Sequence, residues 1–345
     1  MRAFPTTIGA GGDIGLAQQR IKMPVSVQTC LHSFTPSGWF PMLQKIQEVA
    51  MQIGAIVVGK PRQIRLTLAC LFARGHLLLE DLPGVGKTTL AHTLARSLGL
   101  DYKRIQFTND LLPADITGSS VYQRQEQRFS FMPGPVFTQM LLADEINRAS
   151  PKSQSALLEA MEERQVSVEG VAHRLPEPFF VIATQNPQDQ IGTFPLPESQ
   201  LDRFLMRISL GYPDRAAERA LLTGQSRREM LETLPPVLSA ADLAALQAAV
   251  DQVHVADPLL DYVQELIAAT RSGQWFAQGL SPRAGIALMR AARAQALIEG
   301  RNYVAPDDVQ AIFPQCAAHR MTPASAAGRG ALEQTQAMLE AVPLP

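Results

Sequence analysis

A glycine-rich segment between an apolar run and a helical segment constrains this chain more than any other feature. The run His76–Leu79 leads through Glu80 into Asp81–Thr89, with the sequence Asp-Leu-Pro-Gly-Val-Gly-Lys-Thr-Thr, and then into a helical pattern over Leu90–Leu98. A strand, a glycine-rich turn and a helix are together the context of a phosphate-binding P-loop. An ordinary glycine-rich turn before a helix is the alternative, and the agreement of both string and context disfavours it.

The residue types in this loop suit a nucleoside triphosphate and its magnesium ion. Glycines let backbone N–H groups approach phosphate oxygens, Lys87 offers a cation to the β- and γ-phosphates, and the Thr88 hydroxyl can ligate Mg²⁺. Asp81 replaces the usual first glycine and brings a carboxylate near an anion site, unless its side chain points away. We expect ATP to be bound by Pro83, Gly84, Val85, Gly86, Lys87, Thr88 and Thr89.

Two further apolar runs end in polar residues. Met140–Ala143 is followed by Asp144 and Glu145, and Phe179–Ala183 is followed closely by Asn186. Ligands of open α/β sheets bind beyond the carboxyl ends of the strands. We therefore expect Asp144 to hold Mg²⁺ through water, Glu145 to orient or deprotonate the attacking water, and Asn186 to contact that water or the γ-phosphate. A polar strand end and an Asn-Pro turn are the simpler alternatives.

Arg203 lies on a short segment before the predicted domain boundary. A surface ion pair with Asp202 or Glu198 is its simplest interpretation. As an arginine finger, it would instead stabilise transition-state charge at the nucleotide of a neighbouring subunit. Arg207, one helical turn further on, is the competing candidate for that role.

Arg283 is predicted in the first turn of a helix that starts with Ser281 and Pro282. The helix dipole disfavours a cation at that end. Its position therefore suggests an anion nearby.

The segment pattern predicts an α/β domain followed by a smaller all-helical one. The chain has 345 residues, of which 46% are hydrophobic and 18% charged, typical of a globular protein of about two domains. Helices and apolar strands alternate over residues 41–213, which predicts a parallel sheet. Residues 214–345 carry helical patterns and a C-terminal tail, and residues 1–40 are interpreted as a disordered arm or an over-extended start. The expected helices of the second domain cover residues 214–230, 239–252, 257–271, 282–299 and 306–319.

Composition excludes several classes of protein. With 31 Lys and Arg against 32 Asp and Glu, the chain lacks the basic excess of proteins held by nucleic-acid phosphates, so no nucleic acid is expected. No apolar stretch approaches the roughly 18 residues of a membrane span. Cys30, Cys70 and Cys316 have no metal-ligand spacing, which favours a reducing, cytoplasmic location.

Taken together, these motifs resemble the MoxR family of AAA+ ATPases, in the branch that includes the magnesium chelatase ATPase subunits. The resemblance runs from about Leu43 to Arg320, and Asp81 in place of glycine is a variation associated with this group. The strings that carry it are Leu79–Thr88, Gln106–Gly118, Gly134–Phe137, Leu142–Ala149, Gln154–Glu163, Ala183–Pro187, Leu196–Phe204 and Ser281–Ala284.

The resemblance implies an AAA+ core with a helical lid, assembled as a ring that is usually a hexamer. It implies inserted hairpins near residues 122–133 and 165–178. Family members act as chaperone-like remodellers of protein complexes, often beside proteins with von Willebrand factor A domains. The roles implied are Walker A for Lys87 and Thr88, Walker B for Asp144 and Glu145, sensor 1 for Asn186, trans-acting finger for Arg203 and sensor 2 for Arg283.

Two other functions remain as alternatives. A nucleic-acid motor would need a basic stripe or stacking aromatic residues in the hairpins. Tyr122, Arg124 and Arg128 offer some of this, but Glu126 intervenes. A nucleotide-gated scaffold without hydrolysis would be expected to lack Glu145 or Lys87, and both are present.

Overall fold

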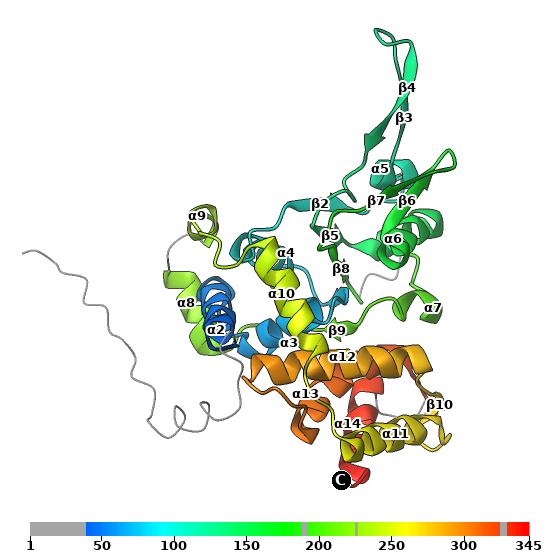
Figure 1. Cartoon of the computed structure of the whole chain (residues 1–345). Helices are drawn as coiled ribbons and strands as arrows, with labels where there is room; N and C mark the ends of the chain where they lie inside the picture. Colours follow the sequence, from blue (N-terminus) through cyan, green and yellow to red (C-terminus); the bar gives the residue numbers. More distant parts are fainter. Residues whose placement is uncertain (1–38, 188–191, 225–226, 325–329, 345) are drawn as a thin grey trace, which may run out of the picture. The chain divides into compact units, whose positions relative to one another are not determined.

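The computed structural model describes residues 39–187, 192–224, 227–324 and 330–344. The predicted N-terminal arm, residues 1–40, lies outside these ranges except for its last two residues, which begin helix α2 (Trp39–Ile56). From α2 onward the chain forms an α/β core followed by a mainly helical lid, and the predicted fold class is confirmed (Figure 1).

A five-stranded parallel sheet forms the centre of the core. Its order is β2 (Tyr102–Gln106), β5 (Met140–Asp144), β8 (Phe180–Gln185), β1 (Leu77–Glu80) and β9 (Met206–Ile208). All neighbouring pairs run parallel. The carboxyl ends of β1, β5 and β8 therefore meet at one edge of the sheet, where the polar residues that follow them come together.

The sequence did not predict β2 and β9, which form the two edges of the sheet. In β2 the only buried residue is Ile105, and β9 is three residues long. Neither gives the continuous apolar run of a strand buried on both faces, which β5 does give.

Helix α6 (Pro151–Glu163) links the core to the candidate site. The Ser150 hydroxyl accepts the N–H of the third helical residue and Pro151 occupies the first turn, a start that both residue types favour. Leu157 and Leu158 pack in the core with β5 and β8, while Glu162 lies near the C-terminal end. The other core helices are α3 (Pro61–Phe72), α4 (Lys87–Ser97), α5 (Pro113–Thr117), the short 3-10 helix η1 (Ile146–Arg148) and α7 (Glu198–Leu201).

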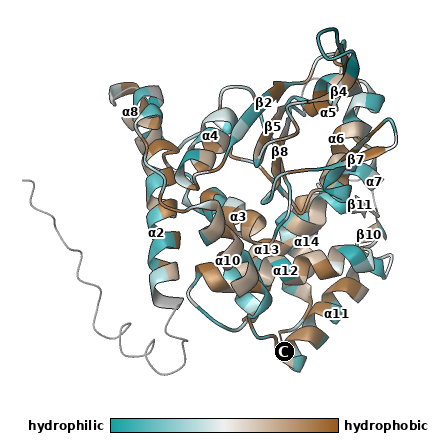
Figure 2. Cartoon of the chain, turned by 45° about the horizontal axis from the view of Figure 1, so that its top comes forward, coloured by the Kyte–Doolittle hydropathy of each residue, from teal (hydrophilic) through white to brown (hydrophobic). Residues whose placement is uncertain are grey.

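Two antiparallel hairpins leave the core. The first pairs β3 (Gly118–Gln123) with β4 (Arg128–Pro133), and the second pairs β6 (Gln165–Val168) with β7 (Val171–Arg174). Glu169 and Gly170 close the second hairpin with positive φ angles of 51° and 80°, the backbone that a two-residue type I′ turn requires. Figure 1 shows β3–β4 projecting from the core, and Figure 2 shows that its tip is hydrophilic.

The lid differs from the prediction in two respects. Strands β10 (Phe276–Gln278) and β11 (Thr322–Pro323) form a small antiparallel sheet, which was missed because both strands are very short. The single helix expected over 214–230 is replaced by α8 (Arg215–Thr223) and α9 (Arg227–Glu232). The remaining lid elements are α10 (Ala240–Asp251), α11 (Asp257–Arg271), α12 (Pro282–Ile298), α13 (Pro306–Ala317), η2 (Ala318–Arg320) and α14 (Ala331–Ala341).

The C-terminal tail is also more ordered than the sequence indicated. Met338 and Leu339 of α14 are buried, and the helix packs against α13 and η2. Among the described residues, no helix combines the length and apolar character needed to cross a bilayer.

Candidate active site

The P-loop connects β1 to α4 and has the backbone that its glycines permit. Gly84 and Gly86 have φ angles of 83° and 98°, in the left-handed region that L side chains rarely adopt. A Cβ at either position would meet no atom within 4 Å, so backbone conformation and not space requires glycine here. Gly86 is the N-cap of α4, and the unpaired N–H groups of such a helix start attract phosphate.

A cavity of about 300 Å³ opens over this loop. It brings together the polar ends of β1, β5 and β8, as the strand order requires. A cationic amine, a hydroxyl and two carboxylates in one cavity match the donor set of a nucleoside triphosphate with Mg²⁺. Its lining residues are Pro83, Gly84, Gly86, Lys87, Thr88, Thr89, Asp144, Glu145 and Asn186, so of the residues predicted for ATP binding only Val85 is not among them.

The Thr184 hydroxyl connects the two acidic residues. It donates to Oδ1 of Asp144 (2.6 Å) and accepts the backbone N–H of Glu145 (2.9 Å). Glu145 itself has a left-handed backbone with a φ of 55°, a strained conformation of a kind that clusters at functional sites. Thr184 therefore holds the Asp144 carboxylate and the Glu145 backbone in fixed positions, a role that the sequence did not indicate.

Two side chains of the edge strand β2 also contact the acidic pair. The Arg104 guanidinium donates to Oδ2 of Asp144 (2.6 Å), and Nε2 of Gln106 donates to Oε2 of Glu145 (2.7 Å). Arg148 forms a second contact with Glu145 (3.1 Å). Sequence reasoning missed Arg104 and Gln106 because β2 itself was missed.

Asp81, the departure from the P-loop pattern, turns its carboxylate away from the phosphate cavity. Its Oδ2 accepts the hydroxyl of Ser209 (3.1 Å) and the backbone N–H groups of Leu210 and Gly211, the latter at 2.8 Å. Its backbone carbonyl accepts Nζ of Lys87 (2.6 Å). Asp81 thus ties the start of the P-loop to the segment that leads from β9 into the lid.

The Asp81→Asn variant is expected to lose about 1–3 kcal/mol of unfolding free energy, because a neutral amide oxygen accepts these three donors more weakly than the carboxylate does. Urea unfolding at neutral pH measures the change. Asp261→Asn is the matched control, since Asp261 is exposed on α11. Equal stability of the two variants would contradict the anchoring role of Asp81.

The two candidate arginines lie outside the phosphate cavity of their own subunit. Nε of Arg203 and Nη1 of Arg283 contact opposite oxygens of one carboxylate, that of Glu162, at 3.0 and 2.9 Å. The ion pair suggested for Arg203 with Asp202 or Glu198 is not the one formed. Arg207, in β9, pairs instead with Glu80 (3.0 Å) at the end of β1.

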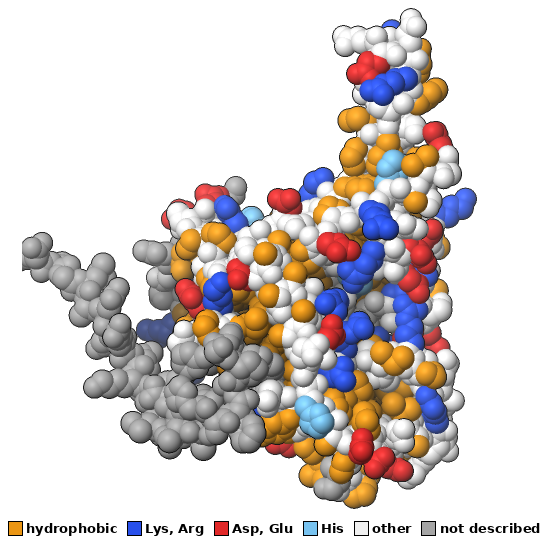
Figure 3. Space-filling model, in the orientation of Figure 1, with side chains coloured by type: hydrophobic (Ala, Val, Ile, Leu, Met, Phe, Trp, Pro, Cys, Tyr) orange, Lys and Arg blue, Asp and Glu red, His pale blue; other side chains and the backbone are white. Residues whose placement is uncertain are grey.

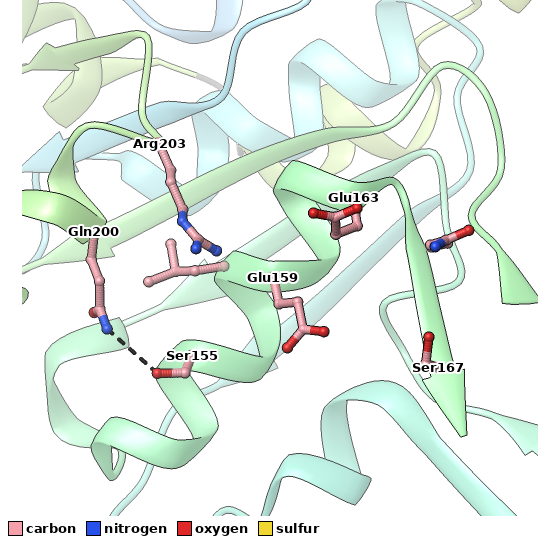
Figure 4. Close-up of a pocket in the computed structure, with 8 residues that line it drawn as sticks. Ser155, Glu159, Glu163, Ser167, Gln200 and Arg203 are labelled. Atoms are coloured by element: carbon pink, nitrogen blue, oxygen red, sulfur yellow. Dashed lines mark hydrogen bonds between the residues drawn. The ribbon is translucent and has the colours of Figure 1, made fainter. Parts of the chain in front are cut away.

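Arg203 separates two hollows. One, of about 490 Å³, is lined by α6, β6 and α7 residues, and Figure 4 shows Arg203 extending toward α6, which carries Glu159 and Glu163. The other, of about 270 Å³, lies between core and lid and is strongly basic. Figure 3 shows Lys and Arg side chains gathered at this boundary. The charged residues of the basic hollow are Arg74, Arg164, Arg203, Arg283, Arg290 and Arg320, with Glu162 and Asp202.

Comparisons with known proteins agree with this geometry. Residues 76–206 match the ATPase family associated with various cellular activities (AAA), and residues 268–342 match the AAA lid domain. The chain is 50% identical over 281 residues to the uncharacterized protein YeaC of Bacillus subtilis, covering 81% of this chain and 87% of that one. It is 42% identical over 289 residues to Chaperone MoxR1 of Mycobacterium tuberculosis, covering 80% of this chain and 75% of that one.

A crystal structure of a candidate ATPase from Cytophaga hutchinsonii has the same fold. Its TM-score is 0.79 at 36% sequence identity, and the match covers 88% of this chain and 96% of that one.

Fold, phosphate loop and lid together define a P-loop ATPase of the AAA class. The chain belongs to the MoxR family within that class, as the relatives named above and the AAA matches establish. The lid match reaches residue 342, so the family resemblance extends beyond Arg320 and includes α14.

Proposed function

We infer that the protein hydrolyses ATP as a ring of identical subunits, six in the usual family form, in which Arg203 and Arg283 of one subunit act on the nucleotide of the next. One observation carries this. The phosphate-binding residues share one cavity, while both arginines lie in another hollow on Glu162. A single subunit therefore holds the two halves of a hydrolytic site apart, and a head-to-tail ring would join them.

Each residue has a role that follows from its position. Lys87 and the N–H groups of the P-loop bind the phosphates, and Thr88 and Asp144 would hold Mg²⁺. The ion would supply charge neutralisation at the transferring phosphoryl group. Glu145 accepts the proton of the attacking water, and Asn186 orients that water. Arg203 acts on the nucleotide of the next subunit, where it neutralises the charge that develops on the transferring phosphoryl group, and Arg283 assists it. In this proposal the trans finger is Arg203 and not Arg207.

The proposed client is another protein, and the proposed location is the cytoplasm. A protein with a von Willebrand factor A domain is a proposed further partner. One relative is named a chaperone, which supports a protein as the client. The β3–β4 hairpin exposes Tyr122 and Phe129, which are 50% and 66% accessible. Its Arg128 is paired with Glu126 (2.5 Å), and Arg124 is the one other basic residue of the hairpin, so the hairpin offers no row of basic side chains for nucleic acid.

Hydrolysis that needs two subunits must depend on assembly. ATP turnover per subunit is expected to rise with protein concentration and to reach a plateau once rings form. Steady-state turnover measured across the concentration range, beside sedimentation velocity on the same samples, tests this. A constant turnover per subunit at concentrations where the protein is monomeric would contradict the proposal.

A further inference from the structure

The Glu162 carboxylate joins two arginines from different domains. Arg203 follows α7 of the core, and Arg283 lies in the first turn of α12 in the lid. Oε2 lies 3.0 Å from Nε of Arg203, and Oε1 lies 2.9 Å from Nη1 of Arg283, so both are ion pairs. The three side chains are 28%, 57% and 32% exposed for Arg203, Arg283 and Glu162, so the group is open on one side.

The two acidic residues closest to Arg203 in the sequence, Asp202 and Glu198, have other partners. Asp202 pairs with Arg320, whose Nε lies 2.8 Å from Oδ1. Oε1 of Glu198 accepts the hydroxyl of Thr322 (2.7 Å). Both partners belong to the lid, so these two carboxylates connect core and lid, and the carboxylate that contacts Arg203 is that of Glu162.

Glu162 also offsets part of the positive charge in the basic hollow. Six arginines and two carboxylates line the basic hollow, and Asp202 serves Arg320. Burial lowers the pKa of Arg164, Glu177 opposes this effect, and the nearby Arg74 and Arg290 add to it. Without the Glu162 charge, Arg203 and Arg283 would repel each other with nothing between them.

The contacts with Glu162 leave donors available for a phosphate group. One guanidinium nitrogen of each arginine lies within 3.0 Å of the carboxylate, and a guanidinium has five N–H donors. The remaining donors of both residues can reach a single anion on the open side, since the two guanidinium groups are held by the same carboxylate. An arginine pair of this kind recognises planar or tetrahedral oxyanions well.

We propose that Glu162 is a positioning residue that holds Arg203 and Arg283 side by side, so that both reach the terminal phosphate of a nucleotide in the neighbouring subunit. This rests on the proposed function. It adds that the core finger and the lid arginine act as one unit, whose geometry depends on a carboxylate outside the phosphate cavity of its own subunit.

The E162Q variant tests the proposal. The amide keeps the shape of the side chain but lacks the charge that holds two guanidinium groups. We expect kcat to fall about 10- to 100-fold, the cost of misplacing groups at a reacting centre, with the KM for ATP within about twofold. E299Q is the matched control, because Glu299 also pairs across the core–lid boundary, with Arg65 (3.0 Å), but at the far end of α12. Its kcat should stay close to that of the wild type.

Mixed rings separate positioning in trans from a role inside the subunit. E162Q subunits keep an intact phosphate cavity, and E145Q subunits keep an intact arginine pair. An equal mixture is expected to regain up to about a quarter of wild-type turnover, because half the sites are competent and half of those face an intact pair. A mixture of R203A with E145Q is the reference for action in trans.

Several results would overturn the proposal. They are an E162Q variant with near wild-type kcat, an equal loss in E299Q, or no gain on mixing E162Q with E145Q although R203A with E145Q does gain. If R203A with E145Q also fails to gain in rings shown to be mixed, the proposed function fails with it, so the two failures can be told apart.

Discussion

Replacing Glu145 by Gln is expected to lower kcat for ATP hydrolysis by about 10²- to 10⁴-fold, the range for removing a positioned general base. The side chain follows β5, and Gln106 and Arg148 hold its carboxylate beside the phosphate cavity. Glutamine retains the shape but cannot accept the proton of water. ATP affinity should remain near that of the wild type, because Lys87 and the P-loop backbone are untouched.

Single-turnover hydrolysis and equilibrium binding of a fluorescent ATP analogue measure the two quantities for E145Q separately. K87A is the contrasting variant, since it should lose binding as well as turnover. An E145Q enzyme that still hydrolyses ATP within tenfold of the wild type would show that another group accepts the proton.

Replacing Arg203 by Ala is expected to lower kcat by about 10³-fold, or roughly 4 kcal/mol of transition-state stabilisation, the lower end for an arginine finger. Because Arg203 lies outside the phosphate cavity of its own subunit, ATP binding by isolated subunits should be unchanged. The loss should therefore be confined to assembled protein.

Arg207 provides the comparison for this prediction. It pairs with Glu80 at the end of β1, so R207A is expected to act on the stability of the P-loop and less on kcat. Steady-state kinetics of both variants at ring-forming concentrations decide between them. A larger loss of kcat in R207A than in R203A would reverse the assignment of the finger.

The sequence predicted the parts of the fold that rest on local patterns. The central strands β5 and β8 were located to within two residues, because strands buried on both faces give continuous apolar runs. Ser281 was predicted to start a helix, and its hydroxyl accepts the backbone N–H expected of a cap. The P-loop could be found in the same way, because its residues are consecutive in the chain.

Contacts between distant segments could not be predicted in this way. Arg203 was assigned carboxylate partners that lie close to it in sequence, but Arg320 and Thr322, more than 100 residues away, occupy them. Glu162 and Thr184 lie within strings that resemble the family, yet nothing in their local sequence indicates their partners. The contacts of Arg104 and Gln106 could not be predicted because both residues lie on β2, an edge strand whose single buried residue gives no strand pattern.

The central claim is that each hydrolytic site is shared between two subunits, and mixing two inactive variants tests it most directly. R203A retains its phosphate cavity and E145Q retains its arginines, so neither should turn over ATP alone. Combined in equal amounts, with mixed rings verified by native mass spectrometry, they are predicted to regain about a quarter of wild-type turnover. Mixed rings that remain as inactive as either variant alone would contradict the shared site.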